Sequence, residues 1–146
     1  MTKGVGTSSF HRPTKEYADK QPEHFSISEH IPIPTIRLSD FMSLLPWDRF
    51  EYVEHIKVDT QGNDLRVLES AGDYLKKVMF VTAEIAKEIQ YERSPTEEEM
   101  DNLMTSYGFE FIPGTNHGEN KTYANRNLKH LWGKPGNKLD YATIGL

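Results

Sequence analysis

Residues 53–85 read VEHIKVDTQGNDLRVLESAGDYLKKVMFVTAEI, and this stretch decides the fold. Residues 53–58 have the pattern of a strand that ends at Asp59. In the next segment Leu65, Leu68, Ala71 and Leu75 recur three or four positions apart, as on one face of a helix. Residues 78–85 then form a nearly continuous apolar run, typical of a strand buried in a parallel sheet. The order strand, helix, strand predicts one right-handed βαβ unit.

Toward the C-terminus the sequence predicts another helix and a hairpin. Residues 94–97 read SPTE, a capping box with proline at the first helical position. An apolar stripe from Met100 to Tyr107 follows, and Gly108 ends it. Residues 109–112 and 121–125 have strand patterns separated by a loop, which predicts an antiparallel hairpin at the sheet edge. A short helix near residues 128–132 and a tail complete the chain.

Toward the N-terminus the signals are weaker. Residues 1–30 are polar and interrupted by glycine and proline, so we predict mostly loop. Residues 31–36, with two prolines, suit an edge strand or an extended segment. A short helix that begins near Ser39 ends at Pro46. We therefore predict one α/β domain with a loop-rich part (1–30), a core (31–132) and a tail (133–146), and a mostly parallel sheet with an antiparallel C-terminal hairpin.

Composition excludes several kinds of function. The chain has 146 residues, enough for one domain, and contains no cysteine. Disulfides, thiolate nucleophiles and cysteine-bound metals are thereby excluded. A net charge of −5 argues against a general nucleic-acid partner. No apolar run approaches the roughly 18 residues of a membrane span, and Met1 is not followed by a signal peptide, so we expect a cytoplasmic protein without a membrane partner.

The candidate site lies where the two strands of the βαβ unit end. Ligands of open α/β sheets bind at the carboxyl ends of strands, where Asp59, Gln61 and Asp64 follow one strand and Glu84 closes the next. Gly62 allows a positive φ or a close approach to a ligand. The structural alternative is that Asp59 caps a turn and Asp64 stabilises the start of a helix.

Residues 56–71, IKVDTQGNDLRVLESA, resemble the signature of the FkbM-family methyltransferases. That signature reads Ile-Lys-[Ile/Val]-Asp-x-[Glu/Gln]-Gly-x-[Glu/Asp], followed by an apolar helix. Shorter segments match other parts of the family in the same order. They are GTSSF at 6–10, TIRLSD at 35–40, TAEI at 82–85, GF at 108–109 and YAN at 123–125.

The resemblance implies a partial Rossmann-like, doubly wound fold and S-adenosyl-L-methionine as methyl donor. It also implies transfer of the methyl group to an oxygen of a small-molecule or glycan acceptor, such as a sugar or secondary metabolite. By position, Asp59 would bind the acceptor or take its proton, and Gln61 and Asp64 would orient the reactants. Asp59, Gly62 and Glu84 would contact the donor.

The chain also departs from the family pattern. The glycine-rich donor-binding turn and the acidic residue that binds the ribose are missing, because Gly4-Val5-Gly6 has no strand before it and no helix signal after it. We therefore expect this chain to correspond to the C-terminal half of the family's domain. Whether it is active alone stays open at this point.

Two other interpretations stay open. The chain could be a non-catalytic remnant or interaction module that forms a homo-oligomer or needs a separately encoded N-terminal half. It could also be a hydrolase in which Asp59, Asp64 and Glu84 gather Mg²⁺. No pair of histidines has a recognisable metal-ligand spacing, so we predict no zinc site and, for the methyltransferase interpretation, no metal.

Overall fold

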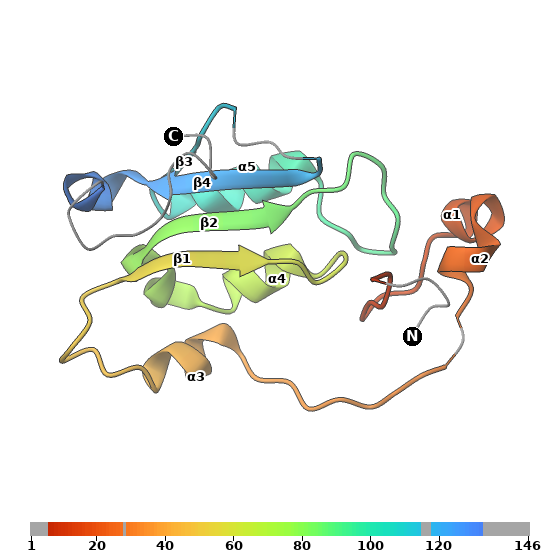
Figure 1. Ribbon diagram of the computed structural model, residues 1–146, viewed down its shortest axis with the longest axis horizontal. Helices are drawn as coiled ribbons and strands as arrows, with labels where there is room; N and C mark the ends of the chain where they lie inside the picture. Colours follow the sequence, from red (N-terminus) through yellow and green to blue (C-terminus); the bar gives the residue numbers. More distant parts are fainter. Residues whose placement is uncertain (1–5, 28, 115–117, 133–146) are drawn as a thin grey trace.

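The computed structural model of the protein describes residues 6–27, 29–114 and 118–132. One sheet lies at the centre with helices packed against it (Figure 1). No helix among these residues is long and apolar enough to span a membrane. In chain order the elements are α1 Lys15–Lys20, α2 Pro22–Phe25, α3 Leu38–Ser43, β1 Val53–Val58, α4 Asp64–Glu69, the 3₁₀ helix η1 Gly72–Lys77, β2 Val78–Glu84, α5 Glu97–Ser106, β3 Phe109–Phe111, β4 Asn120–Asn125 and the 3₁₀ helix η2 Arg126–Leu131.

The sheet is mixed, with the strand order β1-β2-β4-β3. Strands β1 and β2 are parallel, which confirms the predicted βαβ unit. Strand β4 runs antiparallel to both β2 and β3, so the predicted hairpin is also confirmed. The prediction of a mostly parallel sheet is wrong, because only one of the three strand pairs is parallel. The hairpin causes this: its second strand returns beside β2, and both of its pairings are therefore antiparallel.

Helices α3, α4 and α5 contribute to one core on one side of the sheet. Their buried residues Met42, Leu68, Met100 and Met104 pack with Val81 and other apolar residues of the strands. A smaller cluster contains Met79, Phe80, Ile112 and Ala124, and residues of η2 pack against it. The prediction of a doubly wound sheet is not confirmed, since the only described helix that packs against this second cluster is η2, together with Trp132 after it and Tyr52 before β1.

The helix boundaries follow from local sequence. Helix α5 has a capping box two residues later than predicted: the Glu99 backbone N–H donates to Thr96 Oγ1 at 3.2 Å, and the Thr96 backbone N–H donates to Glu99 Oε2 at 2.8 Å. Pro95 therefore precedes the helix, whereas the prediction placed it at the first helical position. Helix α4 is shorter than predicted and ends at Glu69. Gly72 has φ +54°, and η1 begins there, so Leu75 is buried from a 3₁₀ helix rather than from a continuation of α4.

The N-terminal segment contains two short helices where we predicted mostly loop. Thr14 Oγ1 accepts a hydrogen bond from the backbone N–H of Tyr17 and caps α1. The segment forms these helices although its sequence contains few apolar residues. Phe25 lies 5.2 Å from Tyr17 and 5.8 Å from Tyr91, between ring centroids. These aromatic contacts hold α1 and α2 against the loop after β2, a long-range arrangement that local patterns do not reveal.

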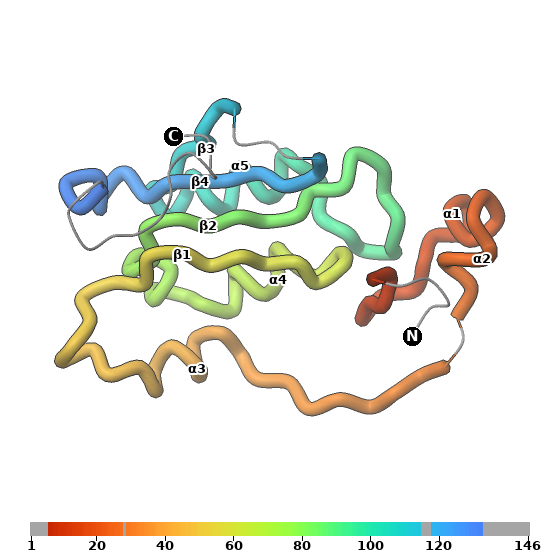
Figure 2. The backbone as a smooth tube through the Cα atoms, in the orientation of Figure 1, coloured from red at the N-terminus to blue at the C-terminus, as the bar shows by residue number. Residues whose placement is uncertain are grey.

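Residues 29–37, before α3, are extended and belong to no strand (Figure 2). This decides between the two alternatives predicted for residues 31–36. Figure 2 shows the segment running apart from the sheet, below β1. Its apolar side chains Ile31, Ile33 and Ile36 are exposed by 49%, 57% and 63%. The predicted tail, residues 133–146, lies outside the described residues.

Candidate functional site

Three polar side chains meet at the carboxyl ends of β1 and β2. The parallel register pairs Val58 with Ala83, so the residues that follow, Asp59 and Glu84, lie level with one another. The Gln61 side-chain amide Nε2 donates to Asp59 Oδ1 at 3.0 Å and to Glu84 Oε2 at 2.6 Å. Gln61 therefore bridges the two carboxyl groups. We call Asp59, Gln61 and Glu84 the rim cluster.

The turn after β1 positions Gln61. Both Gln61 and Gly62 have positive φ, at +53° and +97°, and a side-chain-bearing residue reaches that region only when its surroundings hold it. Ser9 Oγ donates to the Gln61 carbonyl at 2.5 Å, and Tyr91 OH lies 3.4 Å from Gln61 Oε1. Contacts from two distant parts of the chain therefore fix the turn.

Replacing Gly62 by alanine tests how tightly this turn is packed. A Cβ at Gly62 would lie 2.5 Å from Ser94 Oγ and 3.3 Å from Tyr91 Cβ, in addition to the cost of a positive φ. We expect Gly62→Ala to lower the free energy of unfolding by about 2–3 kcal/mol in urea denaturation. Gly72→Ala is the matched control, because φ is also positive there but nothing lies within 4 Å. Its loss should be about 1 kcal/mol, and equal losses would show that the turn is not closely packed.

The carboxyl groups of the rim cluster have displaced pKa values. Burial, a hydrogen bond with Asp59 and the charge of that residue together raise the pKa of Glu84 to about 7. Burial also raises the pKa of Asp59, but hydrogen bonds with Gln61, Glu84 and Lys57 outweigh it and hold that pKa below its usual value. Near neutral pH the pair can therefore hold one proton, with Asp59 as the ionised partner.

The raised pKa of Glu84 predicts a pH-dependent stability. Its pKa is higher in the folded chain than the unfolded value of 4.5, so its contribution is fully present below about pH 4.5 and is lost as pH rises through about 7. We expect Glu84→Gln to avoid this loss. Between pH 5 and pH 8 the free energy of unfolding of the variant should rise by about 1 kcal/mol relative to that of the wild type, a value reduced for the partial exposure of Glu84. Thermal melts at both pH values check this, and parallel pH curves would contradict it.

Asp64 lies apart from the rim cluster, inside the turn. Asp64 is 1% exposed, and its carboxylate accepts hydrogen bonds from the backbone N–H of Thr60 at 3.3 Å and from Thr60 Oγ1 at 3.1 Å. Burial raises the pKa of Asp64 although the bonds from Thr60 lower it. The predicted catalytic role of Asp64 stays a prediction, and its burial favours the structural alternative.

Sequence reasoning missed the residues that reach the rim from outside the βαβ unit. Tyr91 OH, besides facing Gln61, donates to the Thr7 carbonyl at 2.7 Å, and Ser9 binds the Gln61 backbone. The backbone N–H of Glu92 donates to the Arg12 carbonyl at 2.8 Å. The only sequence signal was the serine-containing segment 6–10, which carried no spatial information.

The residues predicted to contact the methyl donor, Asp59, Gly62 and Glu84, do not line one common cavity of the donor's size in the described part of the chain. The cavity beside Gln61, Gly62, Glu84 and Tyr91 measures about 20 Å³, which is room for one water. A ligand of the donor's size needs a pocket of roughly 300 Å³ or more. Gly62 packs against Ser94 and also lines a separate cavity of about 280 Å³ with Leu65 and Arg66. The Asp59 side chain is 50% exposed and stays accessible from the open side of the rim.

Metal binding has no matching cluster in the described part of the chain. No three histidine, aspartate or glutamate residues among those described are placed to hold a metal ion. His55 is half-buried and its Nε2 lies 2.9 Å from Thr82 Oγ1, which itself lies 2.8 Å from Thr122 Oγ1. Burial lowers the pKa of His55.

A second charged cluster joins α5 to β4. The Lys121 side chain is 8% exposed, and its Nζ lies 2.6 Å from Asp101 Oδ1 and 2.8 Å from Glu97 Oε1. Tyr123 OH donates to Asp101 Oδ1 at 2.7 Å. Nothing in the strand pattern around Lys121 indicated that this lysine would be buried.

The comparisons with known proteins bear on these residues. The sequence model of one family, described as the methyltransferase FkbM domain, matches residues 2–111. The match covers more than half of the chain and includes the whole rim cluster. No curated protein and no solved structure matches the chain.

Proposed function

Because this chain belongs to the FkbM methyltransferase family, we propose that it serves methyl transfer to an oxygen, with S-adenosyl-L-methionine as donor. The acceptor is a hydroxyl group of a sugar or secondary metabolite. The observation that carries this proposal is the rim cluster, in which one amide bridges two carboxyl groups with displaced pKa values. Such a pair suits a reaction in which a hydroxyl group loses its proton.

Asp59 is the residue placed to meet the acceptor. It is ionised and its side chain is 50% exposed, so it can accept a hydrogen bond from an acceptor hydroxyl on the open side of the rim. The bound donor would supply an electrophilic methyl group and leave as the neutral thioether. Asp59 would take the proton that the acceptor hydroxyl loses.

Gln61 is the positioning residue of this pair. Its amide holds both carboxyl groups at hydrogen-bonding distance, and its own backbone is held by Ser9. These hydrogen bonds keep the carboxyl group of Asp59 in one orientation. Alignment of the reacting groups is the main contribution that an enzyme can make to an in-line displacement.

Calorimetric titration tests the donor requirement. S-adenosylmethionine and S-adenosylhomocysteine are titrated into the purified 146-residue chain, and folding is verified by circular dichroism. Saturable binding of both supports the proposal for this chain alone. A folded chain that binds neither overturns it for this chain alone and points to a site that a further polypeptide must complete.

A second candidate, the interaction module, is favoured by one observation. Strand β1 is at the end of the sheet, and large apolar side chains of the segments before it are exposed, as an interface would require. These are Ile31, Ile33, Ile36, Phe41, Leu44 and Phe50. We propose that a strand of a second polypeptide, from another copy or a separate half, adds to β1. Sedimentation velocity tests whether the second polypeptide is another copy of this chain. A chain that stays monomeric at all concentrations excludes the homo-oligomer, and a dimer that Leu44→Ser weakens supports it.

A further inference from the structure

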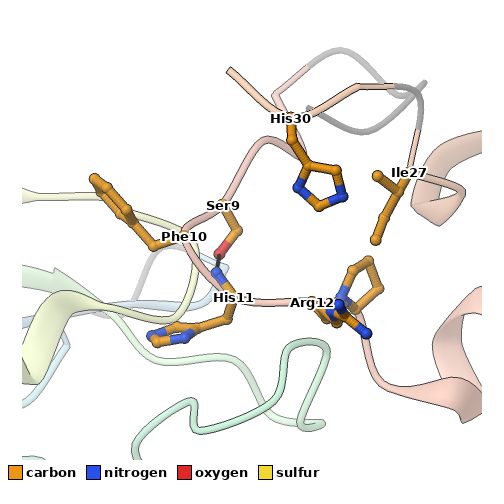
Figure 3. Close-up of a pocket in the computed structure, with 7 residues that line it drawn as sticks. Ser9, Phe10, His11, Arg12, Ile27 and His30 are labelled. Atoms are coloured by element: carbon orange, nitrogen blue, oxygen red, sulfur yellow. Dashed lines mark hydrogen bonds between the residues drawn. The ribbon is translucent and has the colours of Figure 1, made fainter. Parts of the chain in front are cut away.

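A groove lined by basic and apolar side chains adjoins the rim cluster. One cavity of about 270 Å³ is lined by Ser9, Phe10, His11, Arg12, Pro13, Ile27 and His30. A neighbouring cavity of about 600 Å³ shares Ser9, Phe10 and His30 with it and extends to Ile31 and Ile33. Figure 3 shows His30 and Ile27 side by side at the first cavity, while Phe10 and His11 project to the other side of the segment.

The residues that line the two cavities differ in charge from the chain as a whole. The whole chain carries a net charge of −5, yet no acidic residue is among the described residues that line the two cavities, and the first contains Arg12, His11 and His30. No ion pair engages Arg12 or His30 among the described residues. Cationic and N–H groups without an ion pair around a cavity favour an anionic ligand.

The apolar side chains that line the cavities indicate that the ligand also has an apolar part. Phe10 and Ile27 are exposed by 56% and 43%, and Ile31 and Ile33 are about half exposed. Exposed apolar side chains that line one cavity gain free energy when a ligand covers them. A fully polar sugar would not use this surface, whereas a ligand with an apolar part would.

Ser9 connects this groove to the rim cluster. The Ser9 side chain lines both cavities and its Oγ donates to the carbonyl of Gln61, the residue that bridges Asp59 and Glu84. A ligand in the groove therefore lies next to the turn that holds the proposed proton acceptor. The larger cavity, at about 600 Å³, is in the range of small-molecule sites, and the smaller one, at about 270 Å³, lies just below it.

We propose that this groove binds the acceptor as an organic anion, with its carboxylate or phosphate at Arg12 and His30 and its apolar part against Phe10 and the isoleucines. This inference rests on the proposed function and narrows its acceptor to a hydroxyl compound that carries an anionic group. Arg12 supplies the charge and the fork of donors that such groups accept. His30 adds a further N–H group.

Binding of defined probes to the whole 146-residue chain tests the proposal by ¹⁵N NMR titration. The probes are 4-hydroxyphenylacetate, its neutral methyl ester and phenyl phosphate. We expect an anionic probe to bind at least about tenfold more tightly than the ester, and Arg12→Gln and His30→Gln each to weaken it about five- to tenfold. Lys15→Gln, which removes an exposed charge outside the groove, is the matched control and should leave the affinity unchanged. The comparison of the two anionic probes distinguishes carboxylate from phosphate.

Failure of this inference differs from failure of the proposed function. Equal affinity for the acid and its ester, or unchanged affinity in Arg12→Gln, overturns the groove while leaving methyl transfer intact. If the probes bind through Arg12 but no labelled methyl group passes from donor to any hydroxyl compound, the groove stands as an anion site and the proposed function fails. The ¹⁵N spectra of the variants report at the same time whether each is folded.

Discussion

Asp59→Asn should lower methyl transfer by a factor on the order of 10²–10⁴ while the unfolding temperature changes little. The carboxamide keeps the size of the side chain but cannot take a proton. In the wild type Asp59 is the ionised partner of Glu84, and the hydrogen bond from Gln61 faces its Oδ1. The asparagine oxygen can still accept that bond, so the turn should keep its shape. Transfer of a labelled methyl group at saturating donor and acceptor measures the loss.

The control for this variant makes the same chemical change elsewhere. Asp48 is exposed and precedes β1, at the opposite end of the strand from Asp59. Asp48→Asn should keep full activity. If Asp59→Asn retains wild-type turnover with correct folding, Asp59 is not the proton acceptor, and the rim cluster has a structural role only.

Asp101→Ala should cause the largest loss of stability among the charged residues described. Its carboxylate accepts from buried Lys121 at 2.6 and 2.8 Å and from Tyr123 OH at 2.7 Å. Removing it leaves a buried cation with Glu97 as its remaining carboxylate and a buried hydroxyl without its partner. We expect a loss of about 2 kcal/mol in urea denaturation, below the usual range for a buried pair because Asp101 itself is 43% exposed.

Two companion variants separate the causes. Glu97→Ala removes the more exposed partner and should cost less than about 1 kcal/mol. Lys121→Met removes the buried charge together with the cost of burying it, and its side chain can still pack against Phe111 and Tyr123. It should therefore destabilise less than Asp101→Ala. The reverse order would mean that the lysine stabilises through its own charge rather than requiring a partner.

Sequence patterns predicted the parts of the fold that depend on local periodicity. The strands β1 and β2 lie where the patterns placed them, a helix follows β1 as predicted, and α5 begins with a capping box two residues after the predicted one. The strand order was not accessible in this way, because whether β3 or β4 lies beside β2 depends on packing against α5 and not on either strand's own residues. Gly72 shortened α4 for a reason visible only in its positive φ.

The candidate site was likewise predicted only in part from the sequence. The carboxyl-end rule brought Asp59 and Glu84 together correctly, since parallel neighbours end at the same edge. Asp64 follows the same strand but turns inward, because Thr60 offers it two hydrogen bonds. Ser9 and Tyr91 reach Gln61 from distant positions in the chain. Contacts over such separations are set by tertiary structure, and one sequence carries no signal for them.

The titration of the two rim carboxyl groups tests the central claim most directly. Carbon-13 NMR of the side-chain carboxyl carbons, followed from pH 3 to pH 9 in the whole chain, reports each group separately. The account predicts a Glu84 midpoint near 7 and an Asp59 midpoint below its usual value, with each shift responding to the other's titration. Independent titration of Glu84 near its ordinary value of 4.5 would contradict a proton shared between the two residues.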